Sequence, residues 1–144
     1  MWFSKKEADK SPDETPKDQV TTKAVGDAAE SIALGHLRTA GLTLLETNYR
    51  TPGRGGGEID LIMKDRDGTL VFIEVRQRAS QSHGGAGASI SAVKQKRLVF
   101  AARHYLMRYK TLPPCRFDVV LIHGRLGVGD AAEIEWLRAA FGAD

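Results

Sequence analysis

The 144-residue sequence has one cysteine and no long apolar segment. Because Cys115 stands alone, an internal disulfide bond is excluded, and a reducing compartment is expected. No apolar run approaches the ~20 residues that a membrane-spanning helix needs. Met1-Trp2-Phe3 is followed at once by charged side chains, so a signal peptide is not expected. We therefore expect a cytoplasmic protein without a membrane partner.

Acidic side chains are missing from one long stretch of the chain. None occurs between Glu74 and Asp118, although the whole sequence holds 18 acidic residues and has a net charge of only +3. The same stretch contains nine basic residues, namely Arg76, Arg78, Lys94, Lys96, Arg97, Arg103, Arg108, Lys110 and Arg116. Such a block favours a polyanion partner, and DNA is the one we expect. The alternative interpretation is the solvated face of a helix.

The composition divides the chain into two parts. Residues 1–20 are mostly Lys, Asp, Glu, Ser, Thr and Pro, which predicts a disordered tail. Residues 21–144 are long enough for one domain with its own core. Within them, helices are predicted at 22–40, ending at Gly41, and at 91–109, with Ser89 or Ser91 as N-cap.

The remaining segments predict an α/β fold. Strands are predicted at 42–50, 57–64, 69–76, 116–123 and 132–136, and a closing helical turn at 137–141. The order α-β-β-β-α-β-β-α predicts a mixed β-sheet flanked by helices. The first helix is expected to bury Val25, Ala29, Ile32, Ala33, His36 and Ala40, with Glu30 at the margin of this set.

The hairpin formed by residues 57–64 and 69–76 is the most informative stretch. Asp65-Arg66-Asp67-Gly68 between its strands suits a type I turn with Gly68 in the left-handed conformation. Counting back from this turn places Asp60 opposite Glu74 and Glu58 opposite Arg76. The alternating apolar positions are expected to share the other face: Ile59, Leu61, Met63, Val71, Ile73 and Val75.

The predicted Asp60–Glu74 pair needs an explanation. Side chains opposite one another in antiparallel strands have Cβ atoms about 4.5–5.5 Å apart, and like charges at that distance are destabilising. A hard divalent cation with oxygen ligands would turn the repulsion into a binding site. The alternative is a solvated polar face on which Arg76 neutralises the acids.

The second helix begins with polar residues on its expected inner side. Its predicted buried stripe consists of Leu98, Ala102, Tyr105, Leu106 and Tyr109. Extending that stripe backward places Lys94 and Gln95 toward the sheet, beside the hairpin. We expect the nucleic-acid contacts to come from Arg78, Lys94, Gln95, Lys96 and Arg97.

The acidic hairpin resembles the restriction-endonuclease-like superfamily, whose signature is an Asp, a spacer and then Asp/Glu-x-Lys. Within this superfamily, the chain resembles the YraN-like family of bacterial proteins. The matching segments are Thr21-Thr22-Lys23, Gly26-Asp27-Ala28-Ala29-Glu30, Gly56-Gly57-Glu58-Ile59-Asp60-Leu61-Ile62, Val71-Phe72-Ile73-Glu74-Val75-Arg76, Lys94-Gln95 and Cys115-Arg116-Phe117-Asp118-Val119-Val120.

The resemblance implies roles for four residues. Asp60 and Glu74 are expected to be ligands of Mg²⁺ or Mn²⁺, with Glu30 as an auxiliary acid. Arg76 stands where the superfamily usually has Lys. An arginine cannot act as a general base at neutral pH, but it can stabilise charge in a transition state.

The expected activity is that of a metal-dependent nuclease acting on structured DNA, such as a junction or a flap, in the manner of a Holliday-junction resolvase. Two alternatives remain open at this point. One is a catalytically silent nucleic-acid-binding protein of the same fold. The other is a non-catalytic protein that docks onto an acidic partner.

Overall fold

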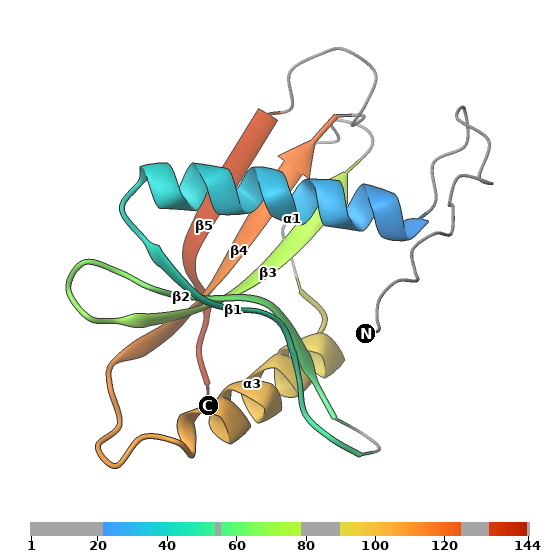
Figure 1. Ribbon diagram of the computed structural model, residues 1–144. Coiled ribbons are helices and arrows are strands. Elements are labelled where there is room, and N and C mark those ends of the chain that lie inside the picture. The colour runs from blue at the N-terminus through green and yellow to red at the C-terminus, as the bar shows by residue number, and fades with distance from the viewer. Residues whose placement is uncertain (1–21, 54–55, 79–89, 125–132, 144) are drawn as a thin grey trace, which may run out of the picture.

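The computed structural model describes residues 22–53, 56–78, 90–124 and 133–143 (Figure 1). The predicted tail at 1–20 lies outside the described residues. The helices are α1 (Thr22–Thr39) and α3 (Ala92–Leu106). The strands are β1 (Thr43–Arg50), β2 (Glu58–Lys64), β3 (Leu70–Arg78), β4 (Cys115–His123) and β5 (Glu133–Phe141). No helix in the described part of the chain is both long and apolar enough to cross a membrane.

The five strands form one mixed sheet in the order β1-β2-β3-β4-β5. Neighbouring strands are antiparallel except β3 and β4, which are parallel. A parallel pair needs a long connection between its strands, and α3 lies in that connection. The predicted mixed α/β sheet flanked by helices is confirmed, and it is consistent with a restriction-endonuclease-like fold.

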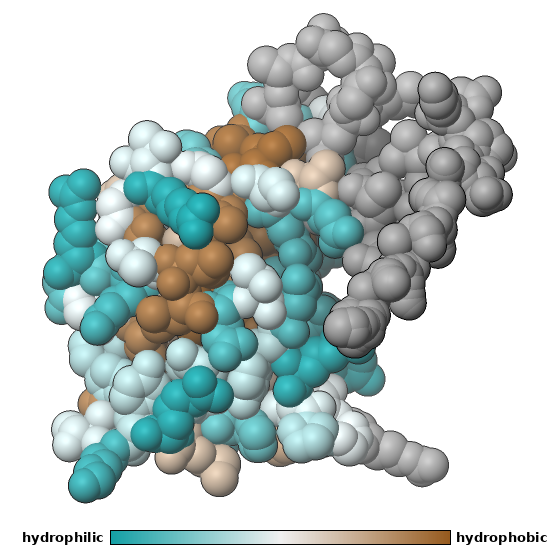
Figure 2. Space-filling model, viewed as in Figure 1, coloured by the Kyte–Doolittle hydropathy of each residue, from teal (hydrophilic) through white to brown (hydrophobic). Residues whose placement is uncertain are grey.

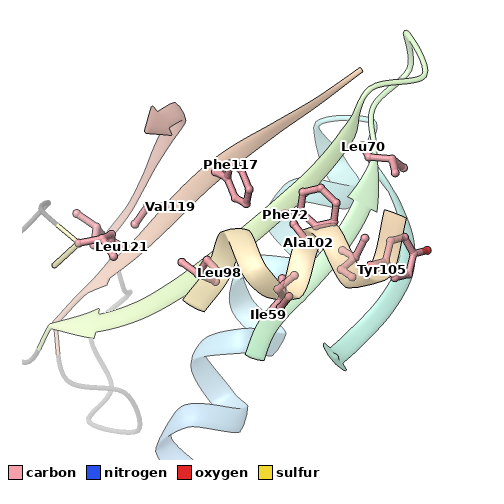
Figure 3. Close-up of a cluster of buried hydrophobic side chains, with 12 residues drawn as sticks. Ile59, Leu70, Phe72, Leu98, Ala102, Tyr105, Phe117, Val119 and Leu121 are labelled. Carbon is pink, nitrogen blue, oxygen red and sulfur yellow. The ribbon is translucent and has the colours of Figure 1, made fainter. Parts of the chain in front are cut away.

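Each face of the sheet carries one helix and one hydrophobic core. Ala29, Ala33 and Leu37 of α1 pack with buried side chains of β2, β3 and β4. On the other face, Leu98, Ala102 and Tyr105 of α3 point toward the sheet, where they meet Ile59, Phe72 and Phe117 (Figure 3). Burying a large apolar side chain stabilises a fold by about 1.5–3 kcal/mol. On the face that carries α1, apolar side chains form a central band framed by hydrophilic ones (Figure 2).

The end of α1 explains one wrong prediction. His36 and Ala40 are exposed, and Leu37 is fully buried in their place. Leu37 continues the i, i+4 row that begins at Ala29 and Ala33, so it is this row that faces the sheet. The helix stops in a Schellman motif, in which the Gly41 N–H donates to the Arg38 carbonyl and the Leu42 N–H to the Leu37 carbonyl. Gly41 has φ +106°, a conformation that favours glycine.

The predicted register of the β2–β3 hairpin is confirmed. Leu61 lies opposite Ile73 and Lys64 opposite Leu70, so the residue numbers of each pair add to the same sum as 60 and 74. The Asp65 N–H donates to the Thr69 carbonyl, and Gly68 has φ +91° as the turn requires.

The predicted faces of the hairpin are partly wrong. Ile62 and Phe72 lie on the side that was expected to be polar, and both are buried under α3. Ile59 joins them instead of packing with Leu61. Both faces of this hairpin are therefore covered beside Glu74, which is buried, whereas the Glu58 side chain is 40% exposed.

The C-terminal segment also differs from its prediction. Residues 133–141 form one strand, and the predicted helical turn at 137–141 is absent. Leu137 pairs with Val119, and the Phe141 ring stacks on Phe117 with centroids 4.9 Å apart. The register shifts beside Asp118, whose Oδ1 accepts the Ala139 N–H at 2.9 Å. The strand is thus held by a side chain of β4, which a local pattern cannot reveal.

Candidate active site

The site begins where the backbone pairing of β2 and β3 ends. Leu61–Ile73 is the last ladder pair before Asp60 and Glu74. Beyond it, the Val75 N–H donates to Asp60 Oδ2 at 2.8 Å. The Asp60 carboxylate thus occupies a backbone donor of the neighbouring strand, which fixes this side chain at the opening of the hairpin.

Glu74 is the more buried member of the acid pair, with 8% of the residue exposed. Burial and then the Asp60 charge raise the pKa of Glu74 to about 7, although Lys94 and Arg76 oppose the shift. Burial also raises the pKa of Asp60, against the hydrogen bond from Val75. Without a metal ion, Glu74 therefore binds a proton near neutral pH.

Lys94 supplies a cation at the acid pair. Its Nζ lies 3.6 Å from Glu74 Oε2. The first turn of α3 is fixed on both sides of it, because Ser91 Oγ accepts the Lys94 N–H at 3.1 Å and Gln95 Nε2 donates to the Ile90 carbonyl at 2.8 Å. The N-cap predicted at Ser91 is confirmed. The prediction that Lys94 faces the hairpin is confirmed as well.

Glu30 approaches the same point from α1. It is half-buried, and its pKa is raised by burial and then by the Asp60 charge, while a hydrogen bond with Asn48 acts in the opposite direction. Arg76 lines a hollow together with Glu74. The structure therefore brings together five of the predicted site residues, which come from α1, β2, β3 and α3: Glu30, Asp60, Glu74, Arg76 and Lys94.

The other predicted nucleic-acid contacts are spread more widely. Gln95 and Lys96 line a separate hollow on the outer side of α3, near Gly142 and Ala143. Arg78 ends β3 opposite His123. Arg97 lies beside Lys94, and both line one hollow next to the acid pair.

Two hollows meet at Lys94. One, of about 460 Å³, is lined by Glu74, Val75, Arg76, Gln77, Ser91 and Lys94. The other, of about 410 Å³, is lined by Arg50, Thr51, Gly53, Gly56, Gly57, Glu58, Lys94 and Arg97. Sequence reasoning missed Arg50 and Thr51, because no local pattern connects them with Lys94 and Arg97 on α3. The density of glycines before β2 was the available signal.

The donor set at the acid pair fits a hard divalent cation. Within the described ranges, no three His, Cys, Asp or Glu side chains are grouped in a way that could hold a metal ion. Mg²⁺, however, is usually held by one or two carboxylates together with water and substrate phosphates, not by a complete protein cage. Asp60 and Glu74 offer two carboxylates on one opening, so the residues present suit an ion that a phosphate would help to bind.

The comparison with known proteins places the chain in a family. The sequence model described as "Uncharacterised protein family UPF0102" matches residues 29–122, which is more than half of the chain. The chain belongs to the UPF0102 family. The five site residues of this UPF0102 family member all lie inside the matched region. The resemblance to the YraN-like family is thereby confirmed.

Individual relatives agree with this assignment. A UPF0102 protein of Polaromonas naphthalenivorans is 66% identical to this chain, and one of Polaromonas sp. strain JS666 is 62% identical. Both alignments cover 99% of each chain. A third UPF0102 protein, from Paracidovorax citrulli, is 65% identical over 87% of each chain.

The stability of this UPF0102 family member should depend on pH through Glu74. The folded-state pKa of about 7 lies above the ordinary value of 4.5, so between these pH values the folded state holds a proton that the unfolded state has lost. Metal-free stability should therefore fall by on the order of 2 kcal/mol from pH 5 to pH 8 through this group. Asp60, Lys94 and Arg76 face it and set the size of the effect.

Glu74→Gln provides the matched comparison, since glutamine has the same shape and does not titrate. Urea unfolding of both proteins in EDTA at a series of pH values measures the effect. The wild type should lose stability relative to Glu74→Gln as the pH rises. Parallel curves would contradict a raised pKa for Glu74.

Proposed function

We propose that this UPF0102 family member is a Mg²⁺- or Mn²⁺-dependent nuclease that hydrolyses phosphodiester bonds in structured DNA, such as a junction or a flap. One observation carries the proposal. The Asp60–Glu74 pair, in which Glu74 is buried, lies at the open end of the β2–β3 hairpin with Lys94 Nζ 3.6 Å from Glu74 Oε2. Burial and the Asp60 charge raise the pKa of Glu74 to about 7, so ionising Glu74 weakens the metal-free fold, and a cation bound between the two acids would offset this cost.

Each site residue has a role in this proposal. Asp60 and Glu74 would hold the ion, and their oxygens are the ligands that Mg²⁺ prefers. When bound, the ion supplies charge stabilisation at the phosphate and lowers the pKa of water. Lys94 and Arg76 place two cations beside the same hollow, where they can stabilise charge on the phosphate oxygens. Glu30 adds a third carboxyl, whose pKa is raised by burial and by the nearby Asp60 charge.

The surface around the acid pair suits a polyanion. Lys94, Arg97 and Arg50 line the hollow on one side, and Arg76 lines the hollow on the other. The first turn of α3 has no acidic side chain, so its backbone N–H groups and its lysine act in the same direction. Binding to DNA should therefore weaken steeply as salt rises.

The test of the function is cleavage of a panel of branched, flapped and linear DNAs with Mn²⁺, together with binding measured across a salt series in Ca²⁺. We expect cleavage of at least one branched DNA and no cleavage in EDTA. Salt-dependent binding without any cleavage would instead support a catalytically silent DNA-binding protein. The absence of both DNA binding and cleavage would support a non-catalytic protein that docks onto an acidic partner.

Lys94→Met is expected to lower single-turnover cleavage by about 10²-fold, as the loss of one charge-stabilising group does in other sites. Methionine keeps the length and apolar stem of the side chain but removes the charge. Single-turnover rates with Mn²⁺ and saturating protein measure the effect.

Lys96→Met is the matched control, because Lys96 lies on the same helix but lines a different hollow. It should weaken DNA binding slightly and leave the single-turnover rate unchanged. Arg76→Lys should also retain cleavage, since lysine supplies the same charge. If Lys94→Met cleaves as fast as the wild type, the charge stabilisation belongs to Arg76 alone.

A further inference from the structure

The hollow lined by Arg50, Lys94 and Arg97, beside the acid pair, is positively charged. Among the described residues that line it, Arg50, Lys94 and Arg97 are cationic and Glu58 is the one acid, so these residues have a net charge of +2. It holds about 410 Å³ and lies next to the opening of the β2–β3 hairpin. An excess of arginine and lysine in a hollow of this size suits an anionic group and disfavours a metal ion.

Hydrogen bonds between Thr51 and Gly57 fix one side of this hollow. Thr51 is buried, and its N–H donates to the Gly57 carbonyl at 3.1 Å. In return, the Gly57 N–H donates to Thr51 Oγ1 at 2.8 Å. These bonds close the ends of the loop onto each other between β1 and β2.

Gly57 also fixes the loop against α3. A Cβ at this position would overlap the carbonyl oxygen of Arg97 and touch Ala101. Only glycine lets the chain approach the helix so closely. A Cβ at Gly56 would likewise overlap Thr51 Oγ1. The close approach lets Arg50, at the end of β1, and Arg97, on α3, line one hollow.

Arg50 is available to a ligand. Its Nε lies 3.7 Å from Glu58 Oε1, but the side chains are 75% and 40% exposed. An ion pair as exposed as this one contributes little to stability, so a stronger anion can replace Glu58 at small cost. Arg97 is exposed as well.

We propose that this hollow, lined by Arg50, Arg97, Thr51 and Gly57, binds a phosphate of the nucleic-acid strand next to the one at the acid pair. The proposal rests on the proposed function, because a strand must reach Glu74 for its neighbouring phosphate to lie here. Lys94 borders both hollows, so a strand that passes over Lys94 has one phosphate on each side. Guanidinium groups bind phosphate oxygens through paired hydrogen bonds, which favours arginine at such a position.

The phosphate can come from two sources. It is either an internal phosphodiester, in which case the strand continues past Arg50, or a terminal phosphate, in which case the hollow selects a strand end. A terminal monoester carries more negative charge than a diester, so the same residues would favour a phosphorylated end.

The test compares Arg50→Gln/Arg97→Gln with the wild type in binding a short flapped DNA in Ca²⁺, where no cleavage occurs. The DNA carries a 5′-phosphate, a 3′-phosphate or hydroxyls at the flap end. The double variant should bind at least about 10-fold more weakly. The slope of the logarithm of the binding constant against the logarithm of the salt concentration should become shallower by about 2, one for each phosphate-binding cation removed. Thermal unfolding confirms that the variant is folded.

Arg103→Gln is the control for general electrostatics. Arg103 also lies on α3, but it lines the separate hollow near Gly142 and Ala143 and donates to the Ala143 carbonyl. Equal losses on all three flaps assign the hollow to an internal phosphodiester. Losses confined to one phosphorylated flap assign it to that strand end. The proposal is overturned if the binding free energy lost by the double variant is no larger than twice the loss caused by Arg103→Gln.

This binding measurement is separate from the proposed reaction. A wild type that cleaves DNA while the double variant binds normally would reject the phosphate site and keep the nuclease. A wild type that cleaves nothing while the double variant binds poorly would keep the phosphate site and reject the nuclease.

Discussion

Asp60→Asn is expected to lower single-turnover cleavage with Mn²⁺ by at least about 10³-fold. A bound metal ion contributes several kcal/mol of transition-state stabilisation, and each 1.36 kcal/mol is about a factor of ten in rate. Asparagine has the same shape as aspartate, and its amide oxygen can still accept the Val75 N–H that Asp60 Oδ2 accepts at 2.8 Å. The substitution therefore removes the charge and keeps the local fold.

The same substitution should raise the metal-free stability at pH 8. Asp60 is the largest charge that opposes ionisation of Glu74, and the neutral amide removes that repulsion. A variant that is more stable but inactive would separate a functional loss from an unfolded protein. A variant that is less stable than the wild type in EDTA would instead mean that Asp60 mainly forms an ion pair.

Glu46→Gln is the matched control for Asp60→Asn. Glu46 is a carboxylate on β1 whose Oε2 lies 3.9 Å from Arg108 Nη1. Glu46 is paired with Ile62, two positions from Asp60 along β2, but its carboxylate faces Arg108 instead of Glu74. Glu46→Gln should leave the cleavage rate unchanged. Equal losses in the two variants would contradict the assignment of the site.

Asp118→Ala is expected to have the largest effect on stability, a loss of about 3–5 kcal/mol, as when one partner of a buried ion pair is removed. Asp118 is 1% exposed. Its carboxylate accepts the Arg116 Nε–H at 3.0 Å, the Trp136 Nε1–H at 2.9 Å and the Ala139 N–H at 2.9 Å. Alanine leaves these donors without their acceptor and releases the register shift of β5.

Asp65→Ala offers the comparison for Asp118→Ala. Asp65 Oδ2 also lies 3.0 Å from Arg116, at Nη1, but Arg116 keeps Asp118 when Asp65 is removed. The loss should therefore be less than half as large. Urea unfolding of both variants measures the difference. Equal losses would show that the network is held by Arg116 and not by the donors of β5.

The register of the β2–β3 hairpin can be predicted from the sequence because neighbouring residues determine it. The turn at Asp65–Gly68 sets the register, and the register alone places Asp60 opposite Glu74. The position of Lys94 follows from helix periodicity in the same way. These predictions depend on the period of one element and on one turn.

The errors arise where distant residues decide the structure. Residues 137–141 continue β5 because Asp118 of β4 accepts the Ala139 N–H. Ile59 packs under α3 because the β2–β3 ladder ends at Leu61, where Asp60 bonds to Val75 instead. Both outcomes depend on one side chain that bonds to the backbone of another strand.

The hollow lined by Arg50 and Arg97 was missed for a related reason. Arg50 lies at the end of β1 and Arg97 on α3, 47 positions later, and no local pattern connects them. They lie at one hollow because Gly57 lets the loop approach the Arg97 turn of the helix. The glycines were visible in the sequence, but the element they contact was not.

The most direct test of the central claim is a Mn²⁺ titration of the DNA-free protein, followed by the electron paramagnetic resonance signal of free Mn²⁺. The wild type and Glu46→Gln should each take up one saturable Mn²⁺ per chain. Uptake should release a proton near pH 7, because Glu74 must ionise to become a ligand. Asp60→Asn and Glu74→Gln should leave the Mn²⁺ signal nearly unchanged. No saturable uptake by the wild type, or equal uptake by Asp60→Asn, would contradict a metal site at Asp60 and Glu74.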